Sequence, residues 1–186
     1  MLSFALNLNH MTVPSLTMKN VGDLARSLGM GGIELRNDLE QPLFDGQAPN
    51  TDMVDGLNVI ALAEVKAFNA FDDATFDRSV DLMYLAVACG AKAIALIPQV
   101  GGDAVSDDGS RTAMAALAPE LASRGLVGLI EPIGFHDSTL RDLRGGYTGP
   151  LSFEAFSPNV HALIDPKAAL SRSTHFIENE ILAHAA

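Results

Sequence analysis

The stretch TMKNVGDLARSLGMGGIELR, residues 17–36, carries the pattern that decides the fold. Its first part, residues 17–28, has apolar side chains at helical spacing: Met18, Val21, Leu24, Ala25 and Leu28. Gly29 and Gly31 follow where such a helix should end. The segment GIELR, residues 32–36, then predicts a buried strand. A helix joined by glycines to a strand is the repeating unit expected of an α/β protein.

The same alternation of strands and helices runs along the rest of the chain. Further strands are expected at residues 3–9, 58–65, 92–97, 126–131 and 151–156, and further helices at 74–89, 111–124, 137–144 and 166–183. Mostly apolar strands separated by helices predict a parallel sheet covered on both faces. Such units build either a doubly wound open sheet or a closed barrel. No phosphate-binding glycine fingerprint follows any strand, which argues against a nucleotide-binding open sheet.

The composition is that of a globular protein. The chain has 186 residues, of which 48% are hydrophobic, and its formal net charge is −11. This composition excludes a disordered chain, and the acidic charge argues against nucleic acid as a partner. A single cysteine, Cys89, cannot form an internal disulfide, so a cytoplasmic location is expected. No targeting segment or membrane span is expected either, because no basic leader or long apolar run is present.

Polar residues gather where the predicted strands end, and two glutamates stand out among them. Glu131 follows LVGLI and Glu154 follows PLSF. The carboxyl ends of parallel strands share one face, so the two carboxylates are expected to converge there. Such a pair can hold a divalent cation or move a proton beside a carbonyl group. The alternative is that they are solvated glutamates or ion-pair partners of Arg36 and Lys66.

Several segments resemble one known family. FALNLNHM, GGIELRND, KAFNAFDD, GLVGLIEPIGF and GYTGPLSFEAF, in this order, are similar to the xylose-isomerase-like TIM-barrel superfamily. The closest resemblance is to its sugar phosphate isomerase/epimerase branch, with inosose isomerase and ketose 3-epimerase relatives. The resemblance implies a TIM-barrel-like parallel β/α fold. It also implies a divalent metal ion (Mn, Co, Mg or Zn), held by Glu after strand five, Asp after strand six, His after strand seven and Glu after strand eight.

The resemblance assigns roles to individual residues. Glu131 matches the first of the two metal-binding glutamates and Glu154 the last, and in the family both glutamates also act as the catalytic acid/base pair. The residues implied as substrate contacts are His10, Glu34, Arg36 and Asn69.

The chain departs from the family in length. A full barrel of eight units has about 250 residues, but only 16 residues lie between Phe135 and Ser152. We therefore expect a single domain over residues 1–186, shortened between about 136 and 149 to about six β/α units. The units lost would carry the Asp and His ligands, so a metal ion is expected to bind weakly. His136 and Asp137 directly follow strand five, which is the wrong position for those ligands.

The sequence thus predicts a metal-dependent sugar isomerase/epimerase that acts on a ketose or inosose, a small sugar or polyol-derived substrate. The alternative is a catalytically impaired or non-catalytic descendant that serves as a binding or oligomeric protein. The DNA-repair branch, of the endonuclease IV type, is disfavoured by the acidic charge and by the lack of a histidine-rich zinc signature. Strand five is expected beside the last strand, with a gap or strained seam there. Apolar surface exposed by the missing units predicts a homo-oligomer.

Overall fold

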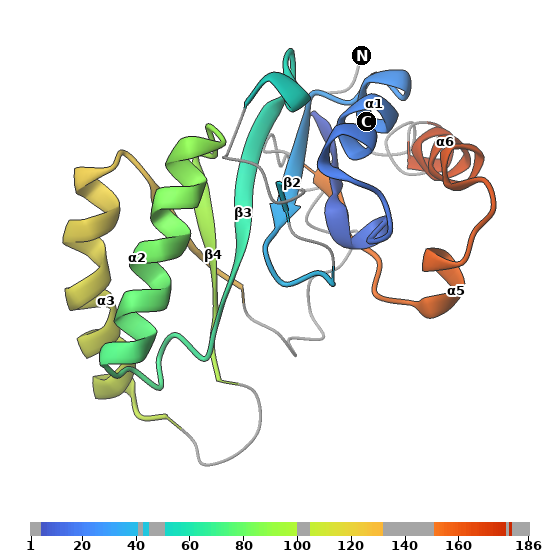
Figure 1. Ribbon diagram of the computed structural model, residues 1–186. Helices are drawn as coiled ribbons and strands as arrows, with labels where there is room; N and C mark the ends of the chain where they lie inside the picture. The colour runs from blue at the N-terminus through green and yellow to red at the C-terminus, as the bar shows by residue number, and fades with distance from the viewer. Residues whose placement is uncertain are drawn as a thin grey trace.

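The structure is a computed structural model that describes residues 5–40, 43–44, 51–99, 105–131, 151–177 and 179. The strands are β1 (Leu6–Asn9), β2 (Gly32–Arg36), β3 (Asn58–Lys66), β4 (Ala93–Ile97), β5 (Val127–Ile130) and β6 (Leu151–Phe153). The helices are α1 (Met18–Ser27), α2 (Asp73–Ala88), α3 (Asp107–Ser123), α5 (Pro158–His161) and α6 (Pro166–Phe176), with 3-10 turns η1 (His10–Thr12) and η2 (Thr51–Val54). Figure 1 shows α2 and α3 beside β3 and β4, with α1, α5 and α6 toward the other end of the sheet.

The strands form one parallel sheet in the order β5-β4-β3-β2-β1-β6. This confirms the predicted fold class, a TIM-barrel-like parallel β/α fold, with six strands among the described residues. The expectation that strand five lies beside the last strand is wrong for the hydrogen-bonded sheet, because β5 and β6 form its two opposite edges. In a closed barrel the last strand pairs with the first, and β6 does pair with β1, with Leu151 opposite Leu6. Among the described residues no strand joins β5 to β6.

The predicted boundaries hold best where the sequence carries local signals. Gly29, Gly90 and Gly125 follow α1, α2 and α3, each with a positive φ that glycine adopts without strain. At the other end of α2, the carboxylate of Asp72 accepts a hydrogen bond from the amide of Thr75 at 2.7 Å. Among the described residues no helix is both long and apolar enough to cross a bilayer.

Other boundaries differ from the predictions. Helix α3 begins four residues earlier than expected, because the hydroxyl of Ser106 accepts a hydrogen bond from the amide of Gly109 and caps it there. Strand β6 ends three residues early, since the amide of Ala155 turns to the hydroxyl of Thr12. The short helix α5 was not predicted. The predicted helix at 137–144, and with it the proposed shortening, lies outside the described residues.

The two faces of the sheet have different chemistry. Side chains alternate between faces along a strand, so Leu6 and Leu8 of β1 pack in the main core while Asn7 and Asn9 point to the other face. The main core lies between the strands and the helices, and includes Leu8, Val21, Ile33, Leu35, Leu62, Met83, Ile94, Leu96 and Leu117. A small separate cluster on the inner face holds only Ala63, Ala95 and Ile97. The inner face is thus left mainly to polar and small side chains.

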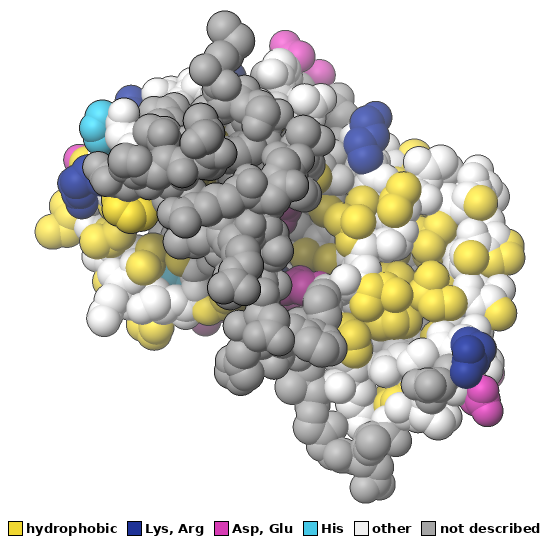
Figure 2. Space-filling model, turned by 180° about the vertical axis from the view of Figure 1, so that it is seen from behind, with side chains coloured by type: hydrophobic (Ala, Val, Ile, Leu, Met, Phe, Trp, Pro, Cys, Tyr) yellow, Lys and Arg dark blue, Asp and Glu magenta, His cyan; other side chains and the backbone are white. Residues whose placement is uncertain are grey.

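The edge strand β5 is unusually exposed for an apolar strand. Val127 is 58% exposed and Ile130 50% exposed, and Leu129 is exposed as well. Figure 2 shows apolar side chains gathered on the half of the molecule that carries α2, α3 and β4. An unpaired strand edge with exposed apolar side chains is a surface on which another chain can pair.

Gly32 provides a test of the close approach between β1, β2 and β3. A Cβ atom at this position would lie 2.7 Å from the carbonyl oxygen of Asn58 and 2.8 Å from Oδ1 of Asn7. We expect Gly32→Ala to lower the free energy of unfolding by about 1–3 kcal/mol, because neither neighbour is the end of a long flexible side chain. Urea unfolding followed by circular dichroism measures this change.

The adjacent Gly31 supplies the control. A Cβ atom there would meet only Cβ of Ala5, at 3.6 Å, an ordinary contact. Gly31→Ala should therefore leave the urea midpoint close to that of the wild type. Equal effects of the two substitutions would contradict the packing described for β2.

Candidate active site

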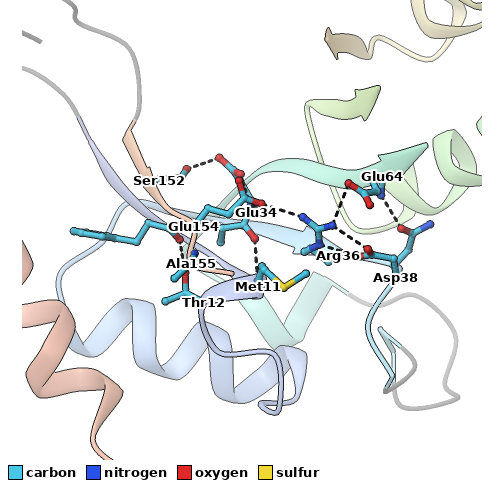
Figure 3. A network of polar contacts seen from close by, with 12 residues as sticks. Met11, Thr12, Glu34, Arg36, Asp38, Glu64, Ser152, Glu154 and Ala155 are labelled. Atoms are coloured by element: carbon cyan, nitrogen blue, oxygen red, sulfur yellow. Dashed lines mark hydrogen bonds and ion pairs between the residues drawn. The ribbon is translucent and has the colours of Figure 1, made fainter. Parts of the chain in front are cut away.

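The guanidinium group of Arg36 lies at the centre of a polar cluster at the carboxyl ends of the strands (Figure 3). Its Nε and Nη2 donate to the two oxygens of Asp38 at 2.8 and 2.9 Å. Nη1 donates to Oε1 of Glu154 at 3.0 Å, and Nη2 lies 3.1 Å from Oε2 of Glu64. The Arg36 side chain is only 3% exposed. One buried cation therefore binds three carboxylates: one that follows β2, one in β3 and one that follows β6.

The buried position of Arg36 depends on these partners. Burial alone would lower its pKa, but Asp38, Glu64 and Glu154 outweigh burial and raise it. Burial would likewise raise the pKa of Asp38, whereas the hydrogen bonds and positive charge of Arg36 hold it well below its usual range. Both groups stay charged at neutral pH. Lys66, which is largely exposed, adds a second cation 3.0 Å from Glu64 and 3.2 Å from Asp38.

A second set of hydrogen bonds connects Glu34 of β2 with β1 and β6. Nδ2 of Asn9 donates to Oε2 of Glu34 at 2.8 Å and to Oε1 of Glu154 at 3.1 Å. The hydroxyl of Ser152 donates to Oε1 of Glu34. Asn9, Glu34 and Ser152 all project from the inner face, as the alternation along their strands requires. The polar cluster therefore extends across four strands, from β3 to β6.

A cavity of about 580 Å³ opens beside this cluster. It is lined by Met11, Arg36, Asp38, Glu64, Lys66, Ala67, Ile97, Pro98, Gln99, Glu131 and Phe156. The Phe156 ring centre lies 5.8 Å from the Arg36 guanidinium carbon, so an aromatic face adjoins the charged groups. A volume of this order suits a small-molecule ligand.

Glu131 and Glu154 follow the strands at the two opposite edges of the sheet, and of the two only Glu131 is among the residues that line the cavity. Glu131 follows β5 and lines the cavity, while Glu154 follows β6 and contacts Arg36. Burial and then repulsion from Glu64 raise the pKa of Glu131. Burial and then repulsion from Glu131 raise the pKa of Glu154, against the opposing effect of Arg36. The ion-pair alternative from the sequence also applies to Glu154, which is a partner of Arg36.

The other predicted substrate contacts have different surroundings. Glu34 and Arg36 belong to the polar cluster, and Arg36 also lines the cavity. His10 is buried, and its Nε2 donates to the carbonyl of Leu16 at 2.8 Å, while burial lowers its pKa. Oδ1 of Asn69 accepts a hydrogen bond from the amide of Gln99 at 2.7 Å. His10 and Asn69 thus connect loops around the site and are not among the residues that line the cavity.

The described residues offer a divalent metal ion only part of a binding site. Glu131 and Glu154 provide oxygen ligands, which suit hard cations. However, no group of three or more His, Cys, Asp or Glu side chains in the described part of the chain could hold a metal ion. Oε1 of Glu154 is also already bonded to Arg36 and Asn9. The described residues therefore do not fit a tightly bound metal ion; His136 and Asp137 lie outside them.

Several members of the cluster were not singled out as site residues from the sequence. They are Asn9, Asp38, Glu64, Lys66, Ser152 and Phe156. Asn9, Asp38, Glu64 and Lys66 were visible only as polar residues near strand ends. A signal for Asn9 and Ser152 existed in the alternation of LNLN and LSF, which places them on the same face as Glu34.

Comparison with known proteins bears on the fold. No protein-family model matches the chain, and no curated protein matches it in sequence. Among solved structures, a xylose isomerase domain containing protein from Salmonella typhimurium LT2 matches with a TM-score of 0.87 and 16% identity over 98% of each chain. IolI protein with a bound zinc atom matches with a TM-score of 0.77 and 14% identity over 98% of this chain and 99% of that one. L-ribulose 3-epimerase matches with a TM-score of 0.69 and 14% identity over 98% and 95%.

These similarities show that the chain has the fold of the xylose-isomerase-like TIM barrels, as the sequence motifs predicted. The neighbours include proteins named for sugar epimerisation.

The raised pKa of Glu131 generates a prediction about stability. A carboxyl group whose pKa is higher in the folded than in the unfolded state favours folding when protonated, and this contribution is lost as the pH rises through the folded pKa. Glu131→Gln removes the charge permanently. We expect the variant to melt a few degrees higher than the wild type at pH 7, and this difference to disappear near pH 4. Thermal unfolding at both pH values measures it.

Glu40→Gln is the matched control, since it makes the same charge change at an exposed position. It should shift melting little at either pH. A Glu131→Gln variant that is less stable than the wild type at pH 7 would show that the Glu131 carboxylate is not strained by its neighbours.

Proposed function

We propose that this protein is a sugar isomerase or epimerase that transfers a proton next to the carbonyl of a ketose or inosose. The observation that supports this best is the position of Glu131 in the cavity lining, with Glu154 bonded to Arg36, which lines the same cavity. The fold shared with L-ribulose 3-epimerase is consistent with the same chemistry. The substrate we propose is a small sugar or polyol-derived molecule.

The two glutamates are suited to moving a proton in either direction. Proton transfer needs one carboxylate to accept the proton and one carboxylic acid to return it. Each glutamate has a raised pKa, and the charge of Glu131 contributes to the shift at Glu154, so each carboxyl group takes up a proton more readily than an exposed glutamate does. One carboxylate would remove the proton from the carbon beside the carbonyl, which gives an enediolate. The other carboxyl group would return a proton to the opposite face of the same carbon, which restores the carbonyl and completes an epimerisation.

The cavity lining supports this chemistry through apolar surface and positive charge. The ring of Phe156 and the side chain of Ile97 supply apolar surface for the carbon face of a sugar. Arg36 and Lys66 place fixed positive charge near the position where negative charge develops on the substrate oxygens.

The family resemblance also implies a divalent metal ion at Glu131 and Glu154. Since these two carboxylates are the only predicted ligands among the described residues, we propose that any such ion binds weakly.

A non-catalytic binding protein is the second candidate. It is favoured by the ion pair between Arg36 and Glu154, which keeps one oxygen of that glutamate occupied. Such a protein would hold a sugar in the cavity without exchanging its protons.

We also propose that the chain self-associates through the β5 edge. Val127 and Ile130 expose apolar side chains on β5, which in the described part of the chain pairs only with β4, and a second copy would cover them. Sedimentation velocity over micromolar concentrations should show a dimer or larger species. Val127→Lys should shift this species toward monomer, whereas a monomeric wild type would contradict the proposal.

Deuterium exchange tests the proposed reaction directly. The protein is incubated in D₂O with a panel of ketopentoses, ketohexoses and an inosose, and deuterium next to the carbonyl is detected by NMR. We expect incorporation with at least one sugar, and a loss of about 100-fold or more in Glu131→Gln and in Glu154→Gln. The amide keeps the shape of the side chain but cannot accept the proton.

Glu40→Gln serves again as the control and should exchange at the wild-type rate. Wild-type rates in both glutamine variants would overturn the proposed mechanism. Sugar binding in saturation-transfer NMR without any deuterium incorporation would favour the non-catalytic alternative.

A further inference from the structure

The positive charge at the centre of the site belongs to the protein itself. Arg36 contacts Asp38, Glu64 and Glu154, each within 3.1 Å, and these carboxylates belong to three different segments of the chain (Figure 3). The ring of Phe156 lies against the same guanidinium group. A side chain held by partners on several sides, and 3% exposed, is a fixed part of the site.

Arg36 and a metal ion at Glu154 would compete for the same carboxylate. A divalent cation bound to Glu154 would lie close to the guanidinium group, and like charges at such short range repel strongly in a partly buried site. Asn9 strengthens the preference for Arg36, because it donates to the same Oε1 that accepts from Arg36. Glu154 is therefore positioned for a guanidinium partner.

The balance of charge around the cavity also favours Arg36 as the cation that these carboxylates bind. Five carboxylates surround it or lie directly behind it: Glu34, Asp38, Glu64, Glu131 and Glu154. The cations among the described residues of this cluster are Arg36 and Lys66, and Lys66 is 69% exposed. Of these two cations only Arg36 is buried among the carboxylates, so it supplies most of the positive charge that balances their negative charge.

We propose that Arg36 takes the place that a divalent metal ion would have among these carboxylates, as a permanent internal counter-ion, so that the site is assembled without a metal ion. The proposal goes beyond the reaction proposed above and does not depend on it, because it concerns cation binding and can be tested without a substrate.

Substitution of Arg36 by methionine is the direct test. Arg36→Met keeps an unbranched chain but leaves Asp38, Glu64 and Glu154 without their buried cation. We expect the wild type to bind Mn²⁺ with a Kd of about 1 mM or weaker, which is typical of incomplete oxygen sites. The variant should bind Mn²⁺ at least about tenfold more tightly, because three carboxylates become available to it. Isothermal titration calorimetry measures both affinities, and Mn²⁺ should raise the melting temperature of the variant only.

Two further variants separate the position of the charge from its amount. Lys66→Met loses one positive charge from the same Asp38 and Glu64, but Lys66 is exposed and makes no contact with Glu154. It should change Mn²⁺ affinity by less than about threefold, since an exposed charge is screened by solvent. Arg36→Lys keeps the buried charge and should bind Mn²⁺ as weakly as the wild type.

Tight Mn²⁺ binding by the wild type would overturn the proposal, and so would an Arg36→Met variant that binds Mn²⁺ no more tightly than Lys66→Met. If Arg36→Met does not fold with or without Mn²⁺, an NMR measurement on the wild type tests the proposal instead. The Nε–H group of Arg36, which donates to Asp38, can be observed by ¹H–¹⁵N NMR. Its signal should not move when Zn²⁺ is added in excess, whereas a shift that saturates at one equivalent would show that a metal ion displaces Arg36.

Discussion

The architecture depends on one constraint, the alternation of side chains along parallel strands. In β1 and β2 every second residue is Leu or Ile and packs in the core shared with the helices. The residues between them, Asn7, Asn9, Glu34 and Arg36, are thereby placed on the inner face. Because the strands are parallel, the last inner residue of each strand reaches the same end of the sheet. The same strands therefore supply both the core and the site, with alternate residues on each of the two faces.

The inner face has room for a site because its apolar residues are small. Ala63 and Ala95 are among the few apolar residues that gather there, with Ile97 near the cavity. Polar groups fill part of the remaining space: Asn9 donates to Glu34 and to Glu154, and Arg36 donates to the same Glu154. The result is a charged cluster with more carboxylates than cations. Burial raises the pKa values of Glu131 and Glu154, and repulsion from neighbouring carboxylates raises them further. Perturbed carboxyl groups of this kind are found most often at functional sites.

The sequence predicted the features that depend on local patterns. Periodicity and glycine positions gave the parallel β/α order, the helix ends at Gly29 and Gly90, and the placement of Glu131 and Glu154 at strand ends. It did not predict that Asp38 and Glu64 would hold Arg36, or that His10 and Asn69 would connect loops. These contacts depend on which strands are neighbours and in what register, and residues far apart in the chain determine both. The position of β5 at the opposite edge of the sheet from β6 has the same origin.

The polar cluster also helps to hold the edge strand that carries Glu154. Strand β6 has only three residues and pairs on one side, with β1. Side-chain bonds add to this pairing: Ser152 donates to Glu34, and Glu154 accepts from Asn9 and Arg36. Thr12 secures the strand further, since its hydroxyl donates to the carbonyl of Phe153 at 2.6 Å and accepts from the amide of Ala155. No strand hydrogen-bonded between β5 and β6 fixes Glu131 relative to Glu154 in the described residues. Among the described residues, Glu154 is held by the buried guanidinium group of Arg36, and Glu131 by the hydrogen bond from its amide to the carbonyl of Leu96 in β4.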